Sequence, residues 1–205
     1  MWIKICGMTT SAAVSAALEA GVDAVGFVFA PSSRRLTPHA AAALAQPVRG
    51  RVCCVAVTRN PTQQEVDEIL THFAPDLLQS DAADLSGLRL PAELARLPVV
   101  RSTGSVPVPL PPRILFEGPG SGSGAVTDWS LAASLARRTK LVLAGGLSAA
   151  NIAAALARVR PWGVDVSSGV ESEPGVKSPV EIVKFVAAVR AAMSVPAATP
   201  AGDPT

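Results

Sequence analysis

Short runs rich in β-branched and large apolar residues alternate with alanine-rich runs along almost the whole chain. The first kind gives eight strand candidates: Trp2–Cys6, Ala24–Phe29, Arg51–Val57, Asp76–Gln79, Pro98–Arg101, Arg113–Glu117, Lys140–Ala144 and Gly163–Val166. In the second kind, apolar residues recur every three or four positions, as in helices that cover a sheet. These runs are Thr10–Ala20, Pro38–Ala45, Thr62–Phe73, Trp129–Arg138, Ala149–Val159 and Pro179–Met193. The alternation predicts an α/β protein with parallel strands.

The number of strands favours one architecture. Eight strands joined by helices within residues 1–193 predict a single-domain parallel (β/α)8 (TIM) barrel. A doubly wound open sheet would show the same alternation and is the structural alternative. Four prolines within residues 104–112 predict a loop or a degraded connection. Residues 194–205, rich in Pro, Ala and Thr, are expected to form a disordered C-terminal tail.

Composition argues against several classes of protein. The chain has 205 residues, of which 49% are hydrophobic, so a sizeable core is available. No stretch long enough to cross a membrane is uniformly apolar, and the start lacks a secretory pattern, so we expect a cytoplasmic protein without membrane contact. A net charge of +2 with scattered basic residues argues against nucleic-acid binding. Three cysteines without zinc spacing and two histidines argue against a metal site.

Residues able to carry acid–base chemistry follow the predicted strands at one end. In such a barrel, the active site lies on the loops after the C-terminal ends of the strands. The first strand ends on Cys6, the second is followed by Arg34 and Arg35, and the sixth ends on Glu117. We therefore expect these groups to converge on one mouth, with Arg34 pointing away from Arg35. Taken alone, Cys6 would also suit a core thiol, and Arg35 a solvated loop charge.

Gly/Ser-rich turns follow the last two predicted strands. Gly145 and Gly146 come after the seventh strand, and Ser168 and Gly169 after the eighth. Loops in these two places commonly bind phosphate, because glycines let backbone N–H groups approach the phosphate oxygens. One glycine pair alone would equally suit a tight turn, but the two turns together favour a phosphate site. Asp165 points either into the mouth or into hydrogen bonds within the barrel.

Several motifs, in order along residues 1–190, resemble those of the phosphoribosylanthranilate isomerase family. They are Lys-Ile-Cys-Gly-Met-Thr (4–9), Gly-Phe-Val-Phe-Ala-Pro-Ser-Ser-Arg-Arg (26–35), Leu-Ala-Gly-Gly-Leu (143–147) with Asn151, Val-Asp-Val-Ser-Ser-Gly-Val-Glu (164–171) and Gly-Val-Lys-Ser-Pro (175–179). The resemblance implies a (β/α)8 isomerase of tryptophan biosynthesis that needs no cofactor and no metal. Such an enzyme converts N-(5-phosphoribosyl)anthranilate to 1-(2-carboxyphenylamino)-1-deoxyribulose 5-phosphate by an Amadori rearrangement.

The same resemblance implies roles for individual residues. It makes Cys6 the general base and the carboxyl group of Glu117 the general acid, and it places Arg35 on the anthranilate carboxylate. The other substrate-binding residues that it implies are Asp165, Gly145, Gly146, Ser168 and Gly169. The expected partner is a small phosphorylated substrate, and the expected state is a monomer or a homodimer.

The chain departs from the family pattern at two positions. Glu117 stands where the family usually has aspartate, and Asp81 stands where it commonly has histidine. A non-catalytic phosphate-ligand-binding barrel that lost its activity through these changes is therefore one alternative. A dual-substrate aminoaldose isomerase is another, although that type carries an aspartate at the position of Cys6.

Overall fold

Eight parallel strands close into a barrel in the computed structural model, which describes residues 1–118 and 128–194. Their order around the barrel is their order in the chain: β1 (Trp2–Cys6), β2 (Ala24–Val28), β3 (Cys53–Val57), β4 (Leu77–Asp81), β5 (Ala95–Arg101), β6 (Arg113–Glu117), β7 (Lys140–Leu143) and β8 (Gly163–Val166). Because β1 pairs with both β2 and β8, the sheet has no open edge. The predicted (β/α)8 barrel is confirmed, and the doubly wound alternative is excluded.

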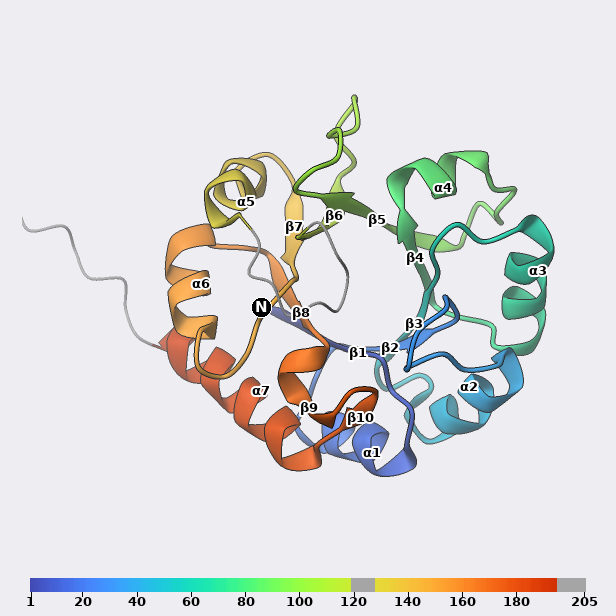
Figure 1. Cartoon of the computed structure of the whole chain (residues 1–205), viewed down its shortest axis with the longest axis horizontal. Coiled ribbons are helices and arrows are strands. Elements are labelled where there is room, and N and C mark those ends of the chain that lie inside the picture. The colour runs from blue at the N-terminus through green and yellow to red at the C-terminus, as the bar shows by residue number, and fades with distance from the viewer. Residues whose placement is uncertain (119–127, 195–205) are drawn as a thin grey trace, which may run out of the picture.

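Helices form a ring around the strands (Figure 1). They are α1 (Ser11–Glu19), α2 (Pro38–Ala45), α3 (Gln63–His72), α4 (Ala82–Gly87), α5 (Trp129–Ala136), α6 (Ile152–Val159) and α7 (Pro179–Ser194). Local sequence fixes where several of them begin: the side chains of Thr10, Thr37 and Thr62 accept hydrogen bonds from the first turns of α1, α2 and α3. Helix α4 was not predicted, because its six residues are too few to show a clear helical period.

Side chains alternate between two apolar layers along each strand. On β1, Ile3 and Ile5 belong to the layer between the sheet and the helices, whereas Lys4 and Cys6 face the barrel interior. The interior layer contains Ala24, Val55, Leu77, Leu97, Val99, Leu115, Val142 and Ala144. Polar side chains inside the barrel are therefore exceptions that call for a reason.

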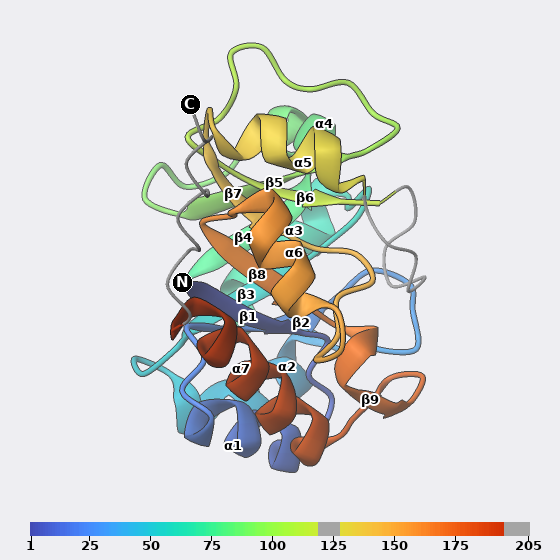
Figure 2. The ribbon, with the colours of Figure 1, turned by 90° about the vertical axis from the view of Figure 1, so that its left-hand side faces the viewer.

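Two connections, the one between β5 and β6 and the one after β8, differ from those of a regular (β/α)8 barrel. Residues 102–112 join β5 to β6 without forming a helix, as their prolines predict. After β8 comes a hairpin that the sequence did not predict, formed by β9 (Glu171–Glu173) and β10 (Val176–Lys177). Figure 2 shows α5, α6 and α7 following one another along one side of the barrel. Helix α7 ends at Ser194, so residues 195–205 of the predicted tail lie outside the described residues.

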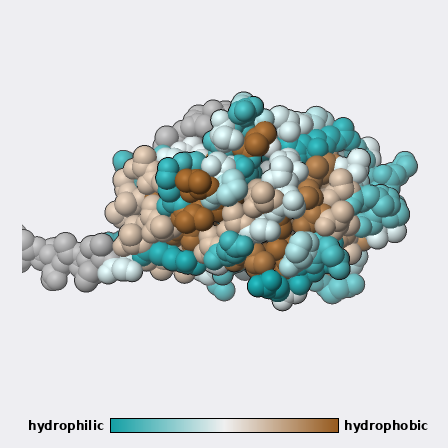
Figure 3. Space-filling model, turned by 90° about the horizontal axis from the view of Figure 1, so that it is seen from below, coloured by the Kyte–Doolittle hydropathy of each residue, from teal (hydrophilic) through white to brown (hydrophobic). Residues whose placement is uncertain are grey.

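The outer surface mixes apolar and polar residues. Figure 3 views the side formed by α1, α7 and the β9–β10 hairpin, where brown and teal residues lie close together. Val176 on the hairpin and Val180, Val183 and Met193 on α7 are exposed large apolar residues. Within the described residues, no helix has the length and apolar content needed to cross a membrane.

Candidate active site

A cavity of about 180 Å³ opens where all eight strands end. Each strand, or the residue that directly follows it, contributes to its wall, as the barrel geometry requires. Of the predicted catalytic and substrate-binding residues, those that line it are Cys6, Glu117, Asp165, Gly145, Gly146 and Ser168. Arg35 and Gly169 do not line this cavity. The predicted convergence therefore holds for most of the set.

Cys6 and Asp165 form a buried cluster with Lys4. The sequence analysis gave Lys4 no role. Lys4 is fully buried, and its Nζ lies 2.9 Å from Oδ1 of Asp165. Burial by itself would lower the pKa of Lys4, but Asp165 and Cys6 raise this pKa above its ordinary value, which favours the ammonium form. Asp165 thus both lines the cavity and hydrogen-bonds within the barrel. The two alternatives predicted for its side chain therefore hold together.

Glu117 lies against Arg101, which also contacts Asp81. Arg101 Nη1 is 2.6 Å from Oε1 of Glu117, and Nη2 is 2.7 Å from Oδ1 of Asp81. All three side chains line the cavity. The two residues at which this chain departs from the family pattern are therefore linked through one guanidinium.

A second ionic cluster forms the rim next to Cys6. Arg34 Nε and Nη2 hydrogen-bond to the two carboxylate oxygens of Glu171 at 2.6 and 2.8 Å, and Lys177 also pairs with Glu171. Burial raises the pKa of Glu171, but the hydrogen bonds from Arg34 and Lys177 outweigh this effect and lower the pKa to about 2. A Cβ at Gly7 would lie 2.5 Å from Cδ of Arg34, so the glycine makes room for this cluster.

The turn after β7 is built for close approach of a ligand to the backbone. Gly145 and Gly146 have φ values of +89° and +65°, which glycine adopts without steric cost. Within the described part of the chain, their amide N–H groups donate no hydrogen bond. Asn151 holds the turn, since its Nδ2 donates to the carbonyl of Gly146 and its Oδ1 accepts from the N–H of Ser148.

The turn after β8 packs directly on the turn after β7. A Cβ at Gly169 would lie 1.9 Å from the carbonyl oxygen of Leu147, so only glycine fits at this position. Ser168 lines the cavity from the same turn. Gly169 therefore brings the two turns together rather than forming the cavity wall.

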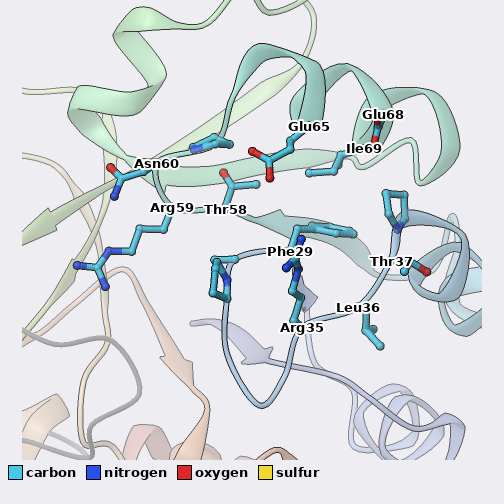
Figure 4. A pocket seen from close by; sticks show the side chains of 14 residues that line it. Phe29, Arg35, Leu36, Thr37, Thr58, Arg59, Asn60, Glu65, Glu68 and Ile69 are labelled. Atoms are coloured by element: carbon cyan, nitrogen blue, oxygen red, sulfur yellow. The ribbon is translucent and has the colours of Figure 1, made fainter.

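Arg35 belongs to a second, larger cavity of about 760 Å³ beside the first. Figure 4 shows Arg35 and Phe29 facing Thr58 and Glu65, with Leu36 nearby. The two cavities share four lining residues: Ala30, Pro31, Thr58 and Arg59. Arg34 lines the first cavity and Arg35 the second, which agrees with the prediction that these neighbours point in different directions.

Among the polar residues that sequence reasoning missed at the first cavity or directly below it are Lys4, Arg101 and Gln79. Gln79 is 6% exposed, and its Oε1 has no hydrogen-bond partner among the described residues. A usable signal existed for Lys4, because a charged residue interrupts an apolar strand on its inward face. Arg101 ends its strand as Glu117 does, and the same strand-end criterion would have found it.

The fold and the cavity define a (β/α)8-barrel enzyme with a thiol, carboxylates and buried cations at the C-terminal ends of its strands. The model of the family "N-(5'phosphoribosyl)anthranilate (PRA) isomerase" matches residues 3–93 and 109–188. The chain belongs to this family and is an isomerase of tryptophan biosynthesis.

Individual members of this family are similar to the chain over nearly their whole length. The N-(5'-phosphoribosyl)anthranilate isomerase of Azorhizobium caulinodans is 41% identical, over 93% of this chain and 92% of the relative. The crystal structure of TrpF from Jonesia denitrificans is 34% identical, with a TM-score of 0.79 over 95% of this chain and 98% of that one. Another phosphoribosyl anthranilate isomerase structure, 29% identical with a TM-score of 0.75 over 93% and 99%, holds reduced 1-(o-carboxyphenylamino)-1-deoxyribulose 5-phosphate.

Proposed function

We propose that the chain converts N-(5-phosphoribosyl)anthranilate to 1-(2-carboxyphenylamino)-1-deoxyribulose 5-phosphate, with Cys6 as general base and Glu117 as general acid. One observation carries this assignment: Cys6 at the end of β1 and Glu117 at the end of β6 line the same cavity as the glycine turn after β7. A base, an acid and an anion-binding turn around one cavity are what an Amadori rearrangement of a sugar phosphate requires.

The reaction then begins with two proton transfers. Glu117 gives a proton to the furanose ring oxygen, the bond from this oxygen to C1 breaks, and the nitrogen lone pair forms a cationic C=N bond. The thiolate of Cys6 next takes the proton from C2, forming S–H. The C2–H electron pair becomes the C1=C2 bond, and the C=N π pair returns to nitrogen. The resulting enolamine tautomerises to the ketone.

The contacts of Glu117 support its part in this scheme. Arg101 holds the Glu117 carboxyl group at the cavity wall and is shared with Asp81. Two carboxylates and one guanidinium carry a net charge of −1, so the group of three can bind one proton and become neutral. Glutamate has one methylene more than aspartate, and the contact with Arg101 holds this longer side chain in one position.

The two cavities support separate sites for the two ends of the substrate. The amide groups of Gly145 and Gly146, which donate no hydrogen bond among the described residues, suit the phosphate together with Ser168. Arg35, beside the apolar side chains of Phe29 and Leu36, suits the carboxylate and ring of the anthranilate group.

Asp165 and Gln79 line the first cavity, and their side-chain oxygens suit the sugar hydroxyls, which are hydrogen-bond donors. Both side chains are buried, so they can hold these hydroxyls in one orientation.

A turnover assay tests this proposal. Purified protein is expected to consume fluorescent phosphoribosylanthranilate without added metal or nucleotide, and the loss of fluorescence reports the rate. Binding of a product analogue without any turnover would contradict the proposal and support a non-catalytic ligand-binding barrel.

A further inference from the structure

Lys4 is a buried cation placed directly below the thiol of Cys6. Both side chains point from β1 into the barrel, and both lie against Gly26 of β2. A Cβ at Gly26 would lie 3.1 Å from Nζ of Lys4 and 3.2 Å from Sγ of Cys6. The missing side chain therefore leaves the space in which the ammonium and the sulfur lie side by side.

Burying a lysine ammonium completely is costly unless nearby groups use its charge. Asp165 compensates part of that cost through the 2.9 Å contact with Nζ. An ammonium has three N–H donors, however, and one carboxylate oxygen accepts only one of them here. The neighbouring sulfur is in a position to use the remaining charge.

We propose that Lys4 is a positioning residue for the general base: its buried ammonium stabilises the thiolate of Cys6, while Asp165 keeps the ammonium in place. The proposal rests on the proposed function, because it takes the base role of Cys6 from there. Lys4 keeps its proton throughout, and the proton from C2 ends on the sulfur.

The other cations around Cys6 are paired with carboxylates of their own. Lys177 and Arg34 both pair with Glu171 at the rim, and Arg101 is divided between Asp81 and Glu117 on the far wall. Asp165 itself disfavours the thiolate. Burial raises the pKa of the Cys6 thiol, and of the neighbouring charges Lys4 counteracts this rise most strongly.

The test measures the thiol itself and needs no substrate. Replacing Cys53 and Cys54 by alanine leaves Cys6 as the one cysteine of the chain. In this background, the ultraviolet absorbance of the thiolate and the rate of alkylation by iodoacetamide are followed against pH. The variants are Lys4→Met, Lys4→Arg and, as a matched control on the exposed face of α7, Lys184→Met.

Lys4→Met is expected to lower the thiolate fraction at neutral pH about tenfold or more. Lys4→Arg keeps a cation and should recover most of the thiolate, and Lys184→Met should change nothing. The direction of the change in thiolate fraction distinguishes this role from a structural one. If Lys4 merely packed the barrel, its loss would loosen the site, hydrate the sulfur and raise the thiolate fraction.

An unchanged or increased thiolate fraction in Lys4→Met would overturn the proposal while leaving the base role of Cys6 intact. If Lys4→Met does not fold, Gly26→Ala takes its place, because the added methyl group pushes the ammonium and the sulfur apart. A decrease in thiolate that is smaller than for Lys4→Met is then expected, because the contacts of 3.1 and 3.2 Å leave the charge in place and shift it only slightly. An unchanged titration would again contradict the role of Lys4.

Discussion

Arg101 on β5 forms an ion pair with Glu117 on the neighbouring strand β6, with 2.6 Å between Nη1 and Oε1. The contact fixes the longer glutamate side chain where the family usually has aspartate. Asp81, at the end of the strand on the other side of β5, holds the opposite nitrogen of the same guanidinium. The two departures from the family pattern are therefore parts of one arrangement.

Glu117→Gln should lower kcat by about 10²–10⁴-fold, because the amide keeps the size of the side chain but has no acidic proton to give. Glu117→Asp keeps the acid and is expected to retain much of the rate. Steady-state kinetics on the two variants side by side measures the difference. A Glu117→Gln enzyme that runs at the wild-type rate would show that the acid is another group.

Asp81→Asn should lower kcat about tenfold, since Arg101 then no longer shares its charge with Asp81 and makes it harder for Glu117 to bind the proton that it donates. The loss should shrink as the pH falls, because a higher proton concentration restores the protonated acid. The measurement is the ratio of variant to wild-type kcat over a range of pH. A ratio that stays constant with pH would mean that Asp81 only packs.

Arg35→Ala should raise KM about 10-fold to 100-fold with a smaller change in kcat, as expected when a charge-assisted hydrogen bond to a substrate carboxylate is lost. Arg138→Ala, which changes another exposed arginine two residues after the end of α5, is the control. An unchanged KM in Arg35→Ala would count against the carboxylate site in the larger cavity.

The stability of the protein should fall in acid through Glu171. Its pKa of about 2 in the folded chain is below its ordinary value of 4.5, so its ion pairs stabilise the fold above about pH 4.5. This stabilisation is lost as the pH falls towards 2. The difference in free energy of unfolding between wild type and Glu171→Gln should therefore be larger at about pH 6 than at about pH 3. Equal differences at both pH values would contradict this assignment.

Much of this arrangement could be predicted from the sequence, because local rules fix it. The strands β1, β6 and β8 have the predicted bounds, since each is a short apolar run that ends at a polar or glycine-rich turn. Strand ends also placed Cys6 and Glu117 at one cavity.

What could not be predicted depends on pairing across the barrel. Lys4 meets Asp165 across 161 positions of sequence, and the hairpin that carries Glu171 to Arg34 is too short to show a strand pattern. The register between neighbouring strands decides these contacts, and no periodicity within one strand reports it.

The most direct test of the account is turnover by Cys6→Ala. The variant should bind the reduced product analogue as the wild type does and keep its fold, measured by circular dichroism. Its kcat should be lower by about 10²-fold or more, because the variant lacks the thiolate that takes the proton from C2. A Cys6→Ala enzyme that folds, binds the analogue and turns over within a few-fold of the wild-type rate would contradict the assignment of the thiol as the base.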